Sequence, residues 1–401
     1  MIEQIFLAIL IGIIAGTFTG LFPGIHINLV AMLLFVLSAF FLQFTSPIVL
    51  ATFIVAMTVT HCFLDFIPSV FLGAPNEDTA LSILPGHRML MEGQGYSAIK
   101  LTTIGAFFGV LIALALTPLF IATAPLFYPI LTKIMAFLLI TIVAFLVFSE
   151  EKKFWAFFIF SLSGILGLAA MNLTVINQPL FPLFSGLFGT SLLSMSFLQN
   201  VVIPKQKIQK INIDKKDMAK TFGLSIIASS LVSFLPGVGS AQAATIASAF
   251  KKFEKKNFLL LLGAVSTITM ILSFVALYAI QKPRSGVAVF AGKFLPYLSL
   301  RHLMLLLFAG LVAASFSVFL SLFFARIFSK GIVKVNYKWL CFLIILFIII
   351  LSLVLSGPLS LLILIAGTSI GIATSLIGIK KIHMMGSLLL PVIIWHLSSV
   401  F

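Results

Sequence analysis

The chain has 401 residues, of which 61% are hydrophobic and 9% are charged. This composition excludes an ordinary soluble domain and predicts an all-α membrane protein with many spans. The net charge of +15 does not indicate a nucleic-acid partner, because the lysines and arginines cluster in short segments between apolar runs. We therefore expect the lipid bilayer, and no nucleic acid, as the surroundings of this chain.

A helix that crosses the hydrocarbon needs about 20 mostly apolar residues. In chain order, the candidate segments are 5–21, 27–44, 47–71, 101–124, 131–149, 154–171 and 180–199, then 221–235, 238–250, 257–280, 301–325, 338–356, 359–379 and 382–400. A polar stretch separates the two series. We expect a first unit at 1–203, a cytoplasmic linker at 204–220 and a second unit at 221–401.

One short pattern occurs in both units. The chain reads Gly20-Leu21-Phe22-Pro23-Gly24-Ile25-His26-Ile27-Asn28 in the first unit and Ser233-Phe234-Leu235-Pro236-Gly237-Val238-Gly239-Ser240-Ala241 in the second. Proline lacks a backbone donor and glycine tolerates unusual dihedrals, so a helix should end before each Pro-Gly and another should begin after it. Either break alone is compatible with an ordinary bend. Breaks at corresponding places in two halves point to a transporter binding site.

The basic residues predict how the two units are oriented. Five clusters hold 18 of the 25 lysines and arginines, at 152–153, 205–220, 251–256, 326–338 and 380–381. Cytoplasmic loops carry the excess of positive charge, so all five clusters should lie inside. The run 221–250 then has both ends inside, whereas the run 5–44 opens outside. We therefore predict two inverted-topology repeats, each a broken hairpin followed by about five spans, with both termini extracytoplasmic.

Each unit also contains a polar stretch after its first full span. The stretch 73–96 carries Pro75 and several acids, and the stretch 281–301 carries Pro283 and several bases. We expect both to be re-entrant segments. Ionisable residues near membrane-embedded structure are costly and are functional candidates by default. The acids in that position are Asp65, Glu77, Asp78 and Glu92.

Some of these residues also have a purely structural interpretation. His61 and Asp65 are four residues apart on one helical face, so they form either a structural pair that caps a neighbouring helix or a coupling-ion site. Glu77 and Asp78 are either acids in a solvated loop or first helical turn, or part of the coupling site. His26, His61 and His87 lack the spacing of metal ligands, so we expect no metal and no cofactor.

Three motifs together resemble the large membrane subunit of the tripartite tricarboxylate transporters, the TctA family. They are the run 20–28, the run 69–100 with its ending Met89-Leu90-Met91-Glu92-Gly93-Gln94-Gly95, and the run 235–244. The resemblance covers the first hundred residues well and 221–300 more loosely. It implies an ion-driven importer of carboxylates such as citrate, with a small membrane subunit and an extracytoplasmic binding protein as partners. The chain departs from the family in its shorter length and in His26, where small residues are usual.

The sequence thus predicts a secondary active transporter, and not an enzyme. The expected substrates are small organic anions, di- or tricarboxylates, moved across the cell membrane with sodium or protons. A helix that begins after each Pro-Gly presents unpaired N–H groups and a positive dipole end, which suit a carboxylate. The expected substrate-binding residues are Pro23, Gly24, His26, Asn28, Pro236, Gly237, Gly239, Ser240, Gln242 and Arg284, and the expected coupling-ion residues are Asp65, Asn76, Glu77 and Asp78.

Two other functions are compatible with the same sequence. A flippase for a lipid-linked phosphate, such as polyprenyl phosphate, would use the same anion site at the helix ends. An intramembrane enzyme would need a positioned base and nucleophile, or a metal site. The sequence shows no spacing of that kind, which favours transport.

Overall fold

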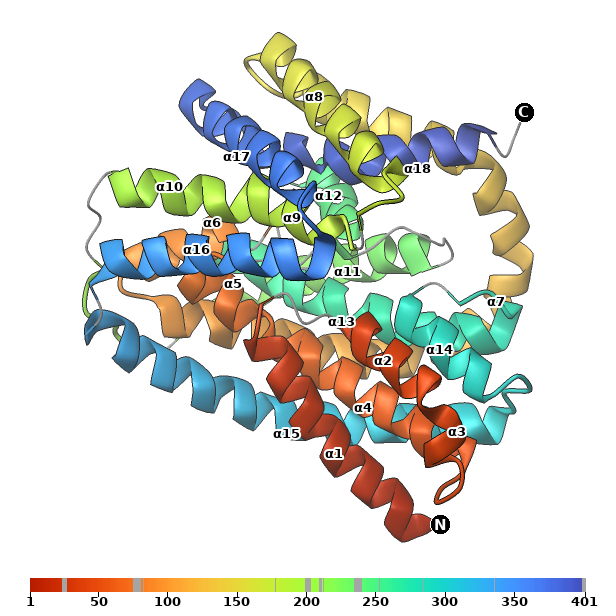
Figure 1. Ribbon diagram of the computed structural model, residues 1–401. Helices are drawn as coiled ribbons and strands as arrows, with labels where there is room; N and C mark the ends of the chain where they lie inside the picture. The colour runs from red at the N-terminus through yellow and green to blue at the C-terminus, as the bar shows by residue number, and fades with distance from the viewer. Residues whose placement is uncertain are drawn as a thin grey trace.

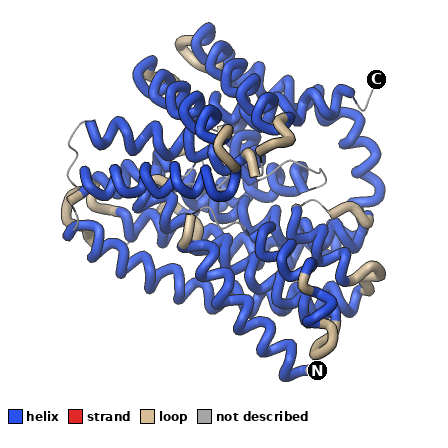
Figure 2. Tube along the Cα trace, in the orientation of Figure 1, coloured by secondary structure: helices blue, strands red, loops and turns tan. Residues whose placement is uncertain are grey.

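The computed structural model describes residues 1–23, 27–74, 81, 83–176, 178–198, 203–208, 211, 213–233, 240–251, 253–283, 285–334 and 336–398. Within these ranges every regular element is a helix (Figure 2). Ten helices there are long and apolar enough to cross a membrane. The predicted class, an all-α protein with many membrane spans, is therefore confirmed.

The first half of the chain begins with a helix that ends at the first Pro-Gly. Its elements are α1 (Ile2–Leu21), α2 (Ile27–Val36), α3 (Ser38–Phe41), α4 (Pro47–Leu64), α5 (Phe66–Leu72), α6 (Ile83–Met91), α7 (Gly95–Phe148), α8 (Lys153–Asn172), α9 (Leu180–Phe184), the π-helix η2 (Ser185–Thr190) and α10 (Ser191–Leu198). The short helix α6 lies in the polar stretch that we expected to be re-entrant.

The second half follows a similar order. Its elements are α11 (Lys215–Ser233), α12 (Ser240–Phe250), α13 (Lys255–Ile280), α14 (Gly286–Phe294), α15 (Leu300–Gly331), η3 (Ile332–Lys334), α16 (Tyr337–Ser356), α17 (Ser360–Ile377), η4 (Lys381–Met385) and α18 (Gly386–Ser398). Figure 1 shows α1, α2, α4 and α14 together at the lower end of the view and α8, α17 and α18 at the upper end.

The structure differs from the sequence-based expectation in three places. The expected spans 101–124 and 131–149 belong to one continuous helix, α7, which contains three prolines and bends along the edge of the molecule (Figure 1). Prolines need not end a helix in a membrane, because neighbouring groups can satisfy the freed backbone. The expected span 27–44 is divided into α2 and α3. The end of the expected linker is helical, because α11 begins at Lys215.

Glycines set the distances between the crossing helices. Gly12, Gly16 and Gly20 on α1 face α4, where a Cβ at Gly12 would lie 2.8 Å from the Cβ of Ala56. Gly105 on α7 and Gly263 on α13 likewise bring those two backbones into contact. Helices in a membrane have no hydrophobic drive to associate, so close backbone packing through small residues replaces it. This packing positions the helix ends that form the candidate site.

Several extensive helix contacts join the two halves of the chain. Helix α13 of the second half packs along α7 of the first, and α4 of the first half packs along α15 of the second. Similarly, α18 packs on α8, and α17 packs on η2. Glycines mediate both members of this second pair of contacts, since Gly167 faces the backbone of Ser387 and Gly371 faces the backbone of Leu187. Each half therefore contributes helices to the packing of the other.

Candidate substrate site and basic cavity

The helix boundaries flank both Pro-Gly motifs, as the sequence predicts. Helix α1 ends at Leu21, two residues before the half-buried Pro23, and α2 begins at Ile27. Helix α11 ends at Ser233 and α12 begins at Ser240. Of the other predicted substrate-binding residues at these motifs, Gly24, His26, Pro236, Gly237 and Gly239 lie outside the described residues.

Next to the first helix break, Asn28 contacts the second half of the chain. This half-buried residue lies in the first turn of α2, and its amide is packed against Gly286, the first residue of α14. A Cβ on Gly286 would lie 2.6 Å from Oδ1 of Asn28. Phe35 of α2 also contacts the rings of Phe290 and Phe294 on α14. Two helix N-termini, one from each half, therefore lie side by side.

Serine side chains hold the N-terminus of α14 in place. Ser285 caps the helix, because its Oγ accepts a hydrogen bond of 3.3 Å from the backbone N–H of Ala288. The backbone N–H of Ser285 donates to Oγ of Ser273 on α13 at 3.1 Å, and the two serine hydroxyls are 2.9 Å apart. Capping by serine satisfies one of the free N–H groups at a helix start. The predicted Arg284 directly precedes this cap and lies outside the described residues.

The second break has different neighbours. Helix α12 packs on α11, α13 and α7, and its first residue, Ser240, is buried. The side chain of Gln242 on α12 is not described. The expectation that the N-termini of α2 and α12 share one anion stays a prediction. The neighbour that the structure places at the N-terminus of α2 is α14, which the sequence did not indicate.

The predicted pair His61 and Asp65 lies beside the first break. Both side chains are buried, and Nε2 of His61 is 3.8 Å from Oδ2 of Asp65. The other ring nitrogen of His61, Nδ1, lies 3.1 Å from Oγ1 of Thr19 on α1. A Cβ on Gly20 would be 2.8 Å from Cβ of Leu64 and 3.3 Å from the backbone N of Asp65. A buried acid at the junction of α4 and α5 thus lies beside the C-terminal end of α1, close to the Pro-Gly motif.

Asp65 and Ser273 lie at the same sequence distance from a proline. Each lies ten residues before the proline of its polar stretch, Pro75 or Pro283. We did not single out Ser273 from the sequence, although aligning the halves on these prolines reveals it. In the second half this position contacts the N-terminus of α14. The corresponding residues after Asp65, including the predicted Asn76, Glu77 and Asp78, lie outside the described residues.

A second feature is a cavity of about 710 Å³ whose walls combine apolar residues with six basic ones. Its walls come from α6, the end of α7, the end of α12, the start of α13 and the segment 378–383. The basic side chains that line it are Arg88, Lys251, Lys255, Lys380, Lys381 and His383. The sequence analysis treated the lysine clusters as topology determinants. Only the fold shows that two of these clusters, 251–256 and 380–381, surround one space together with Arg88.

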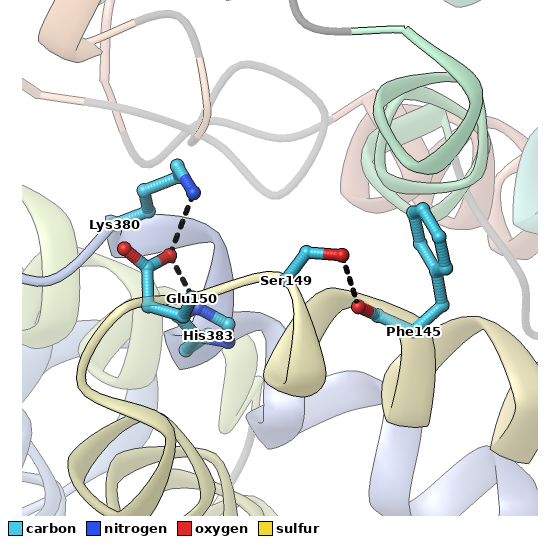
Figure 3. Close-up of polar contacts among 5 residues, drawn as sticks. All are labelled: Phe145, Ser149, Glu150, Lys380 and His383. Atoms are coloured by element: carbon cyan, nitrogen blue, oxygen red, sulfur yellow. Dashed lines mark hydrogen bonds and ion pairs between the residues drawn. The ribbon is translucent and has the colours of Figure 1, made fainter.

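Glu150 joins the two halves at the wall of this cavity (Figure 3). Its Oε2 accepts a hydrogen bond of 2.7 Å from Nζ of Lys380 and lies 3.2 Å from Nε2 of His383. Burial acts to raise the pKa of the Glu150 carboxyl, but the hydrogen bonds and charges of Lys380 and His383 outweigh it and lower that pKa below its ordinary value. Nearby, Lys152 donates to the carbonyl of Ile377 at 2.6 Å.

Ten potential spans, paired helix breaks and buried polar residues beside one break define a multi-pass membrane transport protein. The chain belongs to the tripartite tricarboxylate transporter TctA family, whose family model matches residues 6–386. This match covers nearly the whole chain and confirms the resemblance that the three motifs indicate.

The comparison with individual proteins adds a relative without an assigned function. The chain is 32% identical over 356 residues to the uncharacterized protein MJ1079 of Methanocaldococcus jannaschii. The aligned region covers 87% of this chain and 86% of that protein. No solved structure gives a significant match.

Proposed function

We propose that this protein is a secondary active permease for small organic anions, di- or tricarboxylates, driven by a sodium or proton gradient. The family supports a membrane component of a tricarboxylate transporter. As the family name implies a three-part system, we also propose a small membrane subunit and an extracytoplasmic binding protein as partners.

The observation that carries this proposal is the junction of α2 and α14. The first turns of these helices, from opposite halves, are in contact at Asn28 and Gly286. Helix N-termini attract anions through their free N–H groups and their dipoles, and they do so with little bare charge. We propose that a carboxylate binds beside this junction, with Asn28 and the neighbouring Arg284 as hydrogen-bond donors. Gly24, His26 and the 236–242 segment complete the proposed site.

The proposed inverted repeat is supported by the helix contacts between the two halves. The α7–α13 contact in one place and the α15–α4 contact in another are what a pseudo-two-fold relation between units 1–203 and 221–401 would produce. Alternating access would then move one set of helices against the other around the junction. We propose that the ion pairs of Glu150 with Lys380 and His383 hold the first half of the chain against the second in one of the two states.

The inverted repeat predicts the sidedness of specific residues. We expect cysteines placed at Lys152 and Lys255 to react with an impermeant maleimide from the cytoplasm, and a cysteine at Ser398 to react from outside. Lys152 and Ser398 are exposed, so an absence of labelling there would not be due to burial. Labelling of positions 152 and 398 from the same side would contradict the inverted-repeat topology.

Asp65 is the described member of the proposed coupling site, whose other members are Asn76, Glu77 and Asp78. We expect Asp65→Asn to lower ion-driven accumulation of substrate by at least about tenfold, because the variant keeps the shape of the side chain but loses its charge. Accumulation against a gradient should be measured in proteoliposomes at varied sodium and pH. Asp214→Asn is the matched control, since Asp214 is exposed at the start of α11.

The melting temperature of Asp65→Asn, measured beside its coupling, separates the two interpretations of the His61–Asp65 pair. A structural pair predicts that Asp65→Asn lowers the melting temperature while the surviving protein couples normally. Normal coupling in folded Asp65→Asn would therefore remove Asp65 from the mechanism.

The substrate class is tested by counterflow in proteoliposomes that contain purified protein. Vesicles preloaded with citrate, succinate or another carboxylate should take up the labelled compound, and the preferred carboxylate should depend on sodium or pH. Empty vesicles and vesicles loaded with chloride are the controls. Exchange of a polyprenyl phosphate between leaflets, without carboxylate counterflow, would instead favour the flippase function.

A further inference from the structure

The basic cavity is large enough for a small-molecule ligand. Its volume of about 710 Å³ lies within the ordinary range of ligand pockets, about 300–1,000 Å³. Among its described lining residues, Glu150 is the one acid, whereas five are lysine or arginine. The site is distinct from the α2–α14 junction, because neither Asn28 nor Gly286 lines it.

Most of the positive charge around this cavity is already compensated. Each of three lining lysines has a carboxylate partner: Lys251 with Asp217 at 2.9 Å, Lys380 with Glu150 at 2.7 Å, and Lys255 with Glu92. Such pairs hold lysine side chains in place but leave little net charge. The two remaining cations, Lys381 and Arg88, are those that matter for a ligand.

Lys381 is a buried cation without a protein partner among the described residues. The residue is 7% exposed, and its Nζ has no hydrogen-bond partner. The charged group that acts on it is Arg88 of α6, which repels it. Arg88 is itself exposed and forms no ion pair within the described chain. A buried charge is normally paired, because leaving it alone is strongly unfavourable.

A role in topology alone does not explain this arrangement. A lysine that acts only through the positive-inside rule needs to be in a cytoplasmic loop, where it would be solvated. Lys381 is instead buried at the start of η4, where the residue lines a cavity that Arg88 also lines. Two cations without a carboxylate partner among the described residues, both lining one cavity, suit a bound anion with two or more charges.

We propose that this cavity binds a small anion with at least two charges, carried by carboxylate or phosphate groups, and that Lys381 and Arg88 are its ligands. The paired lysines Lys251, Lys255 and Lys380 also line the cavity. By the basic-cluster rule the cavity faces the cytoplasm, so the anion comes from the cytoplasmic side. The inference does not rest on the proposed transport function, since a binding site can be measured without transport.

The test is direct binding to the purified full-length protein. Citrate, succinate and inorganic phosphate should be titrated by calorimetry, with acetate as the singly charged comparison. We expect Lys381→Met to weaken binding of the preferred multivalent anion by about tenfold or more, and acetate to bind weakly to both proteins. Lys381→Arg should restore binding, because it returns the charge.

Thermal unfolding gives a readout that a merely structural lysine would not produce. Without an anion, Lys381→Met should melt at the same temperature as the native protein or higher, because the change removes an unpaired buried charge. The anion should raise the melting temperature of the native protein and leave that of the variant unchanged. Lys153→Gln is the matched control, since Lys153 is exposed and does not line the cavity.

The outcomes separate this proposal from its rivals. Equal affinity of folded Lys381→Met and native protein would overturn it, and so would an equal loss in Lys153→Gln, which would indicate a general charge effect. If Lys381→Met does not fold, Arg88→Gln at its exposed position provides the same test. Competition between citrate and phosphate tells which anion the site prefers. Anion binding that depends on Lys381, without carboxylate counterflow, would support the proposed site and contradict the proposed transport function.

Discussion

Gly263→Leu is expected to prevent the protein from folding into its native helix packing. Gly263 lies where α13 crosses α7, and a Cβ there would overlap the carbonyl oxygen of Thr102 and approach the backbone N of Ala106 to 3.0 Å. These are backbone atoms of a helix, so they cannot move aside without separating the two helices. Overfilling a packed interface typically costs about 1–3 kcal/mol, and more where backbone atoms must move apart. The bond of 2.8 Å from Thr267 to the carbonyl of Ala106 would be lost as well.

A matched glycine provides the control for this variant. Gly223 lies in α11 with no heavy atom within 4 Å of the place where a Cβ would lie, so Gly223→Leu should fold. The two variants should be compared by the yield of monodisperse protein after size-exclusion chromatography and by melting temperature. Similar values for both would show that the α7–α13 contact tolerates a side chain, contrary to the geometry.

Gly286→Ala is expected to weaken carboxylate binding by about ten- to a hundredfold. The added methyl would lie 2.6 Å from Oδ1 of Asn28, so either the amide turns away or α2 moves from α14. In both cases N–H groups that we propose to hold the carboxylate are misaligned. A hydrogen bond to a charged group contributes about 1.5–3 kcal/mol, which corresponds to that range of affinity.

The same substitution elsewhere on α14 tests the specificity of this effect. At Gly292 an added methyl would meet Cδ1 of Leu277 at 3.0 Å, which is the end of a flexible side chain that can rotate. Gly292→Ala should therefore bind substrate normally, although the substitution is the same and lies in the same helix. Affinity should be measured by titration of purified protein with the carboxylate identified by counterflow. Unchanged affinity in folded Gly286→Ala would exclude the junction as the binding site.

Local physical chemistry explains why the sequence predicted the helical class and the positions of the breaks. A bilayer leaves the backbone no partner but itself, so long apolar runs must be helices. The Pro-Gly pairs at 23–24 and 236–237 lie between helices, because proline lacks a backbone donor, whereas Pro85-Gly86 lies within the first turns of α6. The helix boundaries at Leu21, Ile27, Ser233 and Ser240 follow from these local rules. The family could be recognised for the same reason, since its motifs are short stretches of sequence.

Where local signals conflict, the prediction was less accurate. The apolar runs 101–124 and 131–149 were predicted as separate spans, but α7 continues through both and through its three prolines, because contacts with other helices stabilise a bent helix as well as a broken one. The lysines of the expected linker likewise did not show that α11 begins at Lys215, because lysine is compatible with both a loop and a helix.

The sequence by itself determined the composition of the candidate site: a break, a buried acid four residues after a histidine, and clusters of lysine. The tertiary structure alone decided which of these meet. It placed α14 beside Asn28, Gly20 beside Asp65, and Lys381 with Arg88 around one cavity. The physical reason is that hydropathy and helix-ending residues act over a few neighbouring positions. Pairing between residues hundreds of positions apart depends instead on close packing at glycines, and no single segment contains that information.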